Sequence, residues 1–205
     1  MGIRYPQITS LLEKAVKDEV SQSFADLTMI ELGEQNMTGD THISLAKNYF
    51  LEKGFLHTSF DIKSTGSAVE VDLSKPVNSI VKADVVTNFG TTEHICQGDN
   101  PQYHAYRNVH NFTKKGGLMF HFVPTSGSWP NHCDYWYKLN FFEALFNLLD
   151  YRAVKLEYAS DSIPFYKAPK DMCIAVAVKE SNNDFLTQEA FSPLYKMLEI
   201  KANRS

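Results

Sequence analysis

Acidic and amide side chains lie at the ends of four strand-like segments of this 205-residue chain: Glu31, Asp61, Asp72 and Asn88. Parallel strands deliver their carboxyl ends to one edge of a sheet, so we expect these side chains to share a crevice. A carboxylate such as Asp61 can accept hydrogen bonds from both hydroxyls of a ribose. An acidic residue at a strand end can equally cap a turn, and that alternative stays open for each of them. The pattern indicates a site that holds a nucleoside-bearing ligand.

The segment from Asn88 to His94 reads Asn-Phe-Gly-Thr-Thr-Glu-His. A buried strand that ends in small and polar residues is typical of a functional crevice in an open α/β sheet. Glu93 and His94 can face a substrate there. A histidine is the natural general base near neutral pH, so His94 and the later His132 are candidates to remove a proton.

A second polar segment lies further along the chain. His121 falls inside a predicted strand, and the loop after it carries Trp129, Asn131, His132 and Tyr135. Aromatic side chains in a loop can form a pocket wall, and Asn or His can orient a substrate. Two alternatives stay open: His121 can be a core histidine held by the backbone, and the loop can pack over a dimer interface.

Strand-like and helix-like segments alternate along the chain, which predicts an α/β fold with a mainly parallel sheet and helices on both faces. We expect seven strands, at about residues 27–33, 55–62, 68–73, 83–90, 117–124, 154–160 and 172–179. Helices are expected at about 10–24, from 40 or 41 to 54, and at 103–110, 139–149 and 187–200. The length predicts one domain over 1–205, with a helical segment at 1–26, a core at 27–180 and a C-terminal helix at 181–205.

At these residues the chain resembles the class I S-adenosylmethionine-dependent methyltransferases. The resemblance rests on the ordered segments MIELGEQN, SFDIK, VEVDLS, DVVTNFGTTEH and KKGGLMFHFVP, and it covers roughly Leu27 to Ala177. It implies a Rossmann-like methyltransferase fold whose last two strands form an antiparallel hairpin at the sheet edge. A closer group of methyltransferase-like proteins, with a TNFGTTEH strand and a W-x-NH loop, is also similar.

The resemblance implies S-adenosylmethionine as the cofactor and eight residues that bind it: Glu31, Gly33, Gln35, Asp61, Asp72, Leu73, Asn88 and Phe89. In that family the loop after the first strand faces the amino-acid half of the cofactor, so Glu31 would bind the ammonium group. Asp61 would bind the ribose, while Asp72 and Leu73 would contact the adenine. Asn88 and Phe89 would lie against the cofactor, and His132, His94 or Glu93 would act as the base.

The composition limits the classes of partner that the protein is expected to bind. The formal net charge of −4 argues against non-specific binding to nucleic acid, which needs clustered Lys and Arg. No apolar run approaches the ~20 residues that cross a bilayer, and no signal peptide is expected. Three scattered cysteines favour a reducing compartment, so we expect a cytoplasmic protein. The histidines and cysteines lack zinc-motif spacing, so we predict no metal.

Two functions follow as hypotheses. The first is methyl transfer to a small polar acceptor, for which the closer group alone suggests a sugar or a nucleotide sugar. His121, Trp129, Asn131 and Tyr135 would bind that acceptor. The second is a catalytically inactive fold that binds or assembles, because the first loop carries a single glycine, Gly33. A homo-oligomer is a further expectation, since the apolar segment 139–149 and the aromatic loop offer surplus apolar surface.

Overall fold

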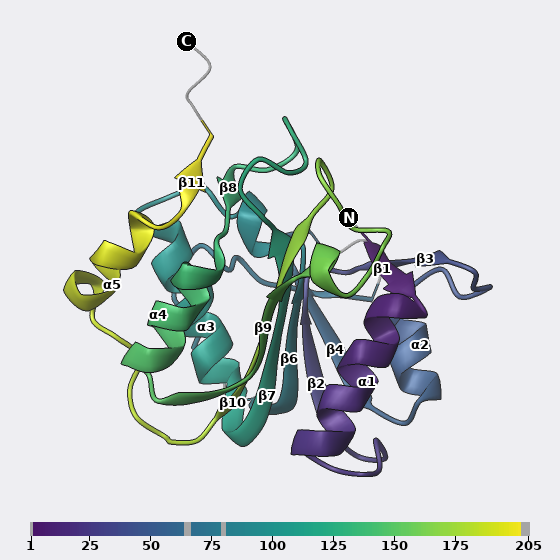
Figure 1. Cartoon of the computed structure of the whole chain (residues 1–205). Coiled ribbons are helices and arrows are strands. Elements are labelled where there is room, and N and C mark those ends of the chain that lie inside the picture. The colour runs from purple at the N-terminus through teal and green to yellow at the C-terminus, as the bar shows by residue number, and fades with distance from the viewer. Residues whose placement is uncertain (1, 64–66, 79–80, 202–205) are drawn as a thin grey trace.

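The fold is a seven-stranded sheet covered by helices on both faces (Figure 1). The structure, a computed structural model, describes residues 2–63, 67–78 and 81–201. The strand order is β5-β4-β2-β6-β7-β10-β9. Strands β5, β4, β2, β6 and β7 run parallel, and β10 runs antiparallel to both of its neighbours. The predicted α/β class, the strand number and the antiparallel hairpin are confirmed.

The strand bounds follow the apolar runs of the sequence. The strands are β2 (Thr28–Leu32), β4 (Leu56–Asp61), β5 (Val69–Glu70), β6 (Ala83–Phe89), β7 (Thr113–Pro124), β9 (Tyr151–Tyr158) and β10 (Met172–Lys179). Strand β10 is buried along its whole length because it lies between β7 and β9 under helices. The third strand, expected over 68–73, pairs only at Val69 and Glu70, where it forms the sheet edge.

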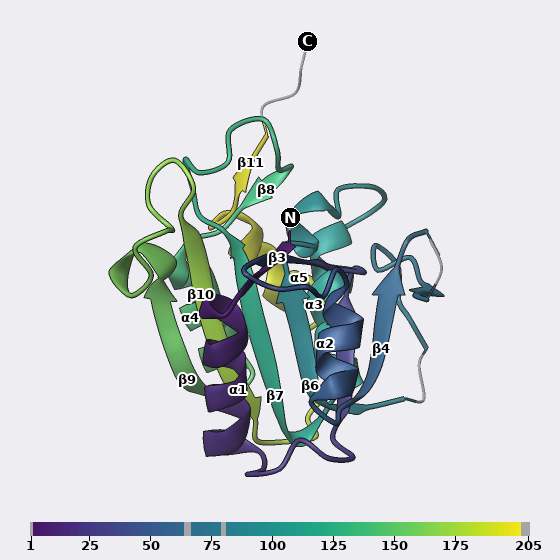
Figure 2. The same ribbon diagram turned by 90° about the vertical axis from the view of Figure 1, so that its right-hand side faces the viewer.

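The helices divide between the two faces of the sheet. Helices α1 (Gln7–Glu19) and α2 (Ala46–Glu52) lie on one face, in front of the strands in Figure 2. Helices α3 (Pro101–Phe112), α4 (Leu139–Leu148) and α5 (Gln188–Tyr195) lie on the other. Two apolar cores result, one under each layer of helices. The predicted first helix begins earlier than expected and ends at Glu19 instead of near residue 24.

A short two-stranded sheet was not predicted. Strand β1 (Gly2–Tyr5) pairs in parallel with β3 (Asn36–Gly39), directly after the first loop of the core. Because β3 is inserted after the first loop, α2 begins at Ala46 and not at residue 40 or 41. The backbone N–H of Ala46 nevertheless donates to the carbonyl of Gln35 at 2.9 Å. The end of β2 and the start of α2 therefore lie close together, with the β3 segment inserted between them.

The C-terminal segment also differs from expectation. Helix α5 ends at Tyr195, and the residues after it form β11 (Glu199–Ile200), which pairs with β8 (Tyr135–Trp136). The expected helix to residue 200 is therefore wrong in its second half, because those residues extend to meet the aromatic loop. Residues 202–205 of the predicted C-terminal helix lie outside the described residues.

The apolar face of α4 packs inside the chain. Phe141, Phe142, Leu145 and Phe146 are buried in the core beneath α3 and α5. This helix therefore gives the expected homo-oligomer no support, and self-association stays a prediction. Among the described residues, no helix is both long enough and apolar enough to cross a bilayer.

Candidate cofactor pocket and its surroundings

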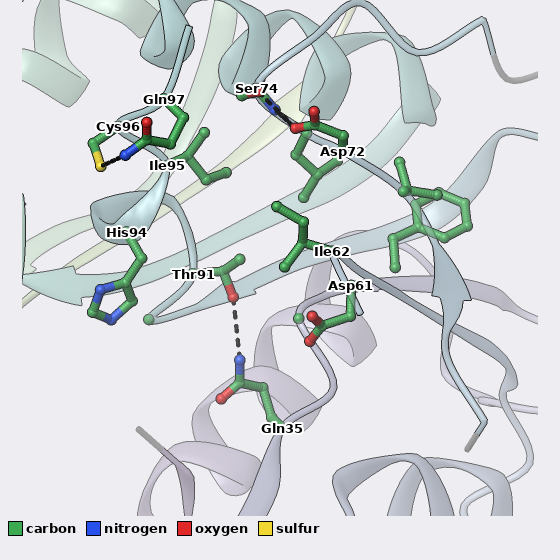
Figure 3. A pocket seen from close by; sticks show the side chains of 15 residues that line it. Gln35, Asp61, Ile62, Asp72, Ser74, Thr91, His94, Ile95, Cys96 and Gln97 are labelled. Atoms are coloured by element: carbon green, nitrogen blue, oxygen red, sulfur yellow. Dashed lines mark hydrogen bonds between the residues drawn. The ribbon is translucent and has the colours of Figure 1, made fainter. Parts of the chain in front are cut away.

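A pocket of about 290 Å³ opens at the carboxyl ends of β2, β4 and β6 (Figure 3). Its wall also includes the segments that follow β5 and β6. Six of the predicted site residues line it: Gly33, Gln35, Asp61, Asp72, Leu73 and His94. The strand ends thus meet where parallel topology places a ligand crevice.

The floor of the pocket depends on Gly33. This residue has a φ of +77°, and a Cβ built on it would lie 2.6 Å from both Gln35 Nε2 and Thr91 Oγ1. Those two side chains are joined by a hydrogen bond of 3.1 Å from Gln35 to Thr91, drawn in Figure 3. Thr91 in turn donates to the carbonyl of Leu32 at 2.6 Å. Only glycine fits this conformation and this close approach.

Asp61 ends β4 on the pocket wall. Its Oδ2 accepts from the backbone N–H of Glu34 at 2.9 Å, and its Oδ1 accepts from that of Lys63 at 3.2 Å. The first of these bonds fixes the loop after β2. Each carboxylate oxygen has further lone pairs, and Asp61 is only half-buried, so it can still accept from a ligand hydroxyl.

Asp72 stabilises a turn and also lines the pocket wall. Its Oδ1 accepts from the backbone N–H and the hydroxyl of Ser74 at 3.0 and 2.6 Å, and Lys75 lies 2.8 Å from Oδ2. The hydrogen bonds from Lys75 and Ser74 hold the pKa of Asp72 below its usual range. The neighbouring Leu73 and the facing Ile95 give this end of the pocket an apolar lining.

Asn88 supports the pocket from beneath. It is 1% exposed and does not line the wall. Its Oδ1 accepts from the backbone N–H groups of Thr91 and Thr92 at 3.3 and 3.2 Å, and its Nδ2 donates to Thr92 Oγ1 at 2.8 Å. Its Nδ2 also lies 3.2 Å from Nδ1 of His121, and Tyr137 donates to Thr92 at 2.9 Å. This buried network holds the turn after β6 in place.

Glu31 lies deeper, on the opposite face of the sheet. It is fully buried, accepts from Ser59 Oγ at 3.2 Å and lies 3.6 Å from His57 Nε2. Burial raises the pKa of Glu31 to about 8 and lowers that of His57 to about 4. His57 stacks on Phe50 of α2. The predicted cofactor residue Phe89 is buried on the same face, away from the pocket wall.

The candidate bases lie together at one end of the pocket. Glu93 and His94 belong to the 3-10 turn η1 (Thr92–His94) after β6. Glu93 is fully buried and His94 lines the pocket, with 3.7 Å between Glu93 Oε1 and His94 Nε2. The ring of His132 meets that of His94 edge-on, with 4.9 Å between centroids. His132 is exposed and outside the pocket wall.

The four predicted acceptor residues are spread out. Trp129 and the exposed Asn131 lie in the loop beside His132, and both have a positive φ. Tyr135 is buried in β8, where its backbone pairs with β11. His121 is 2% exposed in the core, and burial lowers its pKa to about 3. Trp129 thus reaches His94 through the ring of His132, and none of the four lines the pocket.

Several wall residues were not anticipated. Ile95, Cys96 and Gln97 line the pocket opposite Asp61 and Asp72 (Figure 3). In the sequence they begin a polar stretch with no regular pattern. The only signal was their position, since residues that follow the strand ending in Phe89 belong to the same crevice. No group of three or more metal-ligating side chains occurs among the described residues.

Comparison with known proteins gives structural matches alone. No family model and no curated protein matches the sequence. The fold is similar to that of 1,6-didemethyltoxoflavin-N1-methyltransferase of Burkholderia thailandensis, crystallised with 1,6-didemethyltoxoflavin and S-adenosylhomocysteine. The TM-score is 0.59 at 16% identity, over 84% of this chain and 76% of that one.

Two further structures show how widely the fold is used. The N-methyltransferase NodS of Bradyrhizobium japonicum matches with a TM-score of 0.56 at 12% identity, over 84% of this chain and 94% of its own. The [4+2]-cyclase SpnF matches with a TM-score of 0.55 at 11% identity, over 86% and 82% of the two chains. The chain therefore has the fold of class I S-adenosylmethionine-dependent methyltransferases.

Proposed function

We propose that the pocket binds S-adenosylmethionine and that the protein transfers the cofactor's methyl group to a small polar acceptor. The observation that carries this proposal is the pocket at the ends of β2, β4 and β6, with Asp61 on its wall. NodS and the 1,6-didemethyltoxoflavin-N1-methyltransferase, which have a similar fold, have been crystallised with S-adenosylhomocysteine.

The residues present fit such a ligand. Asp61 would accept from the ribose hydroxyls, while Leu73 and Ile95 would enclose the adenine near Asp72. The amino-acid half would lie over Gly33, because a Cβ at that position would intrude on Gln35 and Thr91. Glu31, which the resemblance assigns to the ammonium group, lies buried behind that loop and outside the pocket wall.

When bound, the cofactor supplies an electrophilic methyl group. The protein then has to exclude water, align the acceptor in line with that group and remove its proton. His94 is the pocket residue suited to the last task. A hydroxyl of a sugar or a nucleotide sugar is one acceptor of the required kind.

The proposal is tested by calorimetry with S-adenosylmethionine and S-adenosylhomocysteine. We expect binding to the wild-type protein and at least about tenfold weaker binding to Asp61→Asn, which keeps an oxygen for Glu34 but loses the charge. Asp18→Asn is the matched control, because Asp18 is an exposed residue of α1 that pairs with Lys14 and lies outside the pocket wall. An absence of heat for the wild-type protein would refute the proposal.

A second candidate function is a reaction or binding role without methyl transfer. SpnF has this fold and is a [4+2]-cyclase, so the fold alone does not fix the chemistry. The first loop here also carries one glycine. Isotope-labelled methyl transfer to a cell extract separates the two candidates. Incorporation that is lost in Asp61→Ala supports methyl transfer, whereas equal background in both proteins supports the alternative.

A further inference from the structure

Glu93 is a buried carboxyl group without hydrogen-bond partners. Its exposed fraction is 0%, and neither Oε1 nor Oε2 has a partner among the described residues. A buried polar atom left unpaired is destabilising by roughly 1–3 kcal/mol, and more if it is charged. Because this destabilising group lies in a turn beside a pocket, its presence calls for a functional explanation.

The group that faces Glu93 is His94. Its Nε2 lies 3.7 Å from Glu93 Oε1, which is ion-pair distance, while its side chain is 38% exposed on the pocket wall. Since Nε2 faces the carboxyl group, Nδ1 is on the other side of the ring. No described residue donates to Nδ1 or accepts from it. The Glu93 carboxyl group is thus enclosed by protein, whereas Nδ1 of His94 can contact a ligand.

We propose that His94 takes up the proton of the acceptor and that Glu93 is a positioning residue, which holds the His94 ring and stabilises it when it becomes charged. The inference rests on the proposed function, which it deepens by assigning the base. It also defines the acceptor class, since the reacting atom must carry a proton, as a hydroxyl or an amine does.

The proton balance follows from the geometry. With Glu93 ionised, His94 holds its one ring proton on Nε2, toward the carboxylate, and Nδ1 has a free lone pair. The acceptor's oxygen or nitrogen bonds to the methyl carbon while the carbon–sulfur bond breaks and its electron pair stays on sulfur. The acceptor's proton moves to Nδ1, which leaves an imidazolium beside the Glu93 carboxylate.

The protonation state of the Glu93–His94 pair determines how methyl transfer depends on pH. Burial raises the pKa of Glu93 to about 8 and lowers the pKa of His94. Among the described residues, the charged and titratable groups around His94 are Glu93, His132, Asp134 and Lys201. Below about pH 8 Glu93 is un-ionised and cannot stabilise a charged His94 ring. Its ionisation supplies the negative charge beside the ring, so transfer should rise with pH through a midpoint that belongs to the pair.

The test is an NMR titration of ring-labelled histidine, with no cofactor or acceptor present. In the wild-type protein we expect the His94 signals to change as the adjacent Glu93 ionises, at a pH of about 8. In Glu93→Gln that change should disappear, which leaves the titration of His94 itself, whose pKa burial lowers.

Glu31→Gln is the matched control, because it makes the same substitution in the other Glu–His pair and should leave the change in the His94 signals in place. Glu93→Asp withdraws the carboxyl group by one methylene and should weaken that change, which keeps the test usable if Glu93→Gln misfolds. An unaltered change in the His94 signals in either Glu93 variant would overturn the inference. Calorimetry with S-adenosylmethionine tests the proposed function separately, so either can fail alone.

Discussion

The described residues include two Glu–His pairs with a buried glutamate, one on each side of the central strands. Glu31 and His57 are 3.6 Å apart and Glu93 and His94 are 3.7 Å apart, and burial raises the pKa of both glutamates to about 8. The pairs differ in their histidines. The His57 side chain is wholly enclosed, whereas that of His94 is 38% exposed on the pocket wall.

A carboxyl group with a raised pKa therefore does not by itself indicate catalysis. The same chemistry is structural when both partners are sealed, and it becomes available for proton transfer when one partner reaches a pocket. The two pairs also give each other matched controls.

Replacement of the two histidines should separate the pairs most clearly. We expect His94→Gln to lower methyl transfer by about 10²–10⁴-fold, because general base catalysis is lost. We expect His57→Gln to change transfer by less than about threefold, since its side chain lies outside the pocket wall. Labelled methyl incorporation into a cell extract at pH 8 measures both. Comparable losses in the two variants would contradict the distinction.

For the free energy of unfolding the order should be reversed, with a larger effect at His57 than at His94. His57→Ala removes a buried ring packed on Phe50 and leaves a cavity beside Glu31, so we expect a loss of roughly 3 kcal/mol. His94→Ala removes a partly exposed ring and should lower the free energy of unfolding by under about 1 kcal/mol. Urea unfolding at pH 7 measures both. If His94→Ala proves the more damaging, the assignment of the sealed pair to structure is wrong.

Both glutamates should make the fold less stable as pH rises. Their folded-state pKa is about 8 against an unfolded value near 4.5, so the folded state binds more protons between those values. Their contribution is fully present below pH 4.5 and is lost as pH rises through 8, by at most about 1.4 kcal/mol per pH unit for each group. Urea unfolding from pH 5 to 9 should show a flatter profile in Glu31→Gln and in Glu93→Gln. A wild-type slope that neither variant changes would exclude both groups as its source.

The smallest effect concerns Ser59. It donates the hydrogen bond that Glu31 has and Glu93 lacks. Ser59→Ala makes the two carboxyl groups alike and should lower the free energy of unfolding by about 1 kcal/mol. The His94 titration should not move in this variant. A changed His94 midpoint would mean that the two pairs are coupled through the sheet.

Much of the fold could be predicted because long apolar runs determine it. The segments that became β6 and β10 are continuous and β-branched, as buried strands of a sheet must be. Strands β1 and β3 could not be found, since four residues without alternation carry no local signal. Their pairing is tertiary, and it also displaced the start of α2.

The candidate site was predictable in part for a similar reason. Asp61 and Asp72 reach the pocket because they lie at strand ends, which the sequence marks. Whether a side chain at such an end faces the crevice or a core depends on the strand's two-residue period and its exact end. Asn88 and Phe89 therefore point into opposite cores, and neither lines the pocket. The segment after Glu93 shows no period at all, so its contribution to the wall could not be anticipated.

The most direct test of the account is an amide NMR titration of the wild-type protein with S-adenosylhomocysteine. We predict saturable shifts at Gly33, Glu34, Ser74 and Ile95, which surround the pocket at the ends of β2, β4 and β6. Asp61→Asn should need at least about tenfold more ligand for the same shifts. An absence of shifts at millimolar ligand, or shifts confined to residues away from this edge of the sheet, would contradict the account.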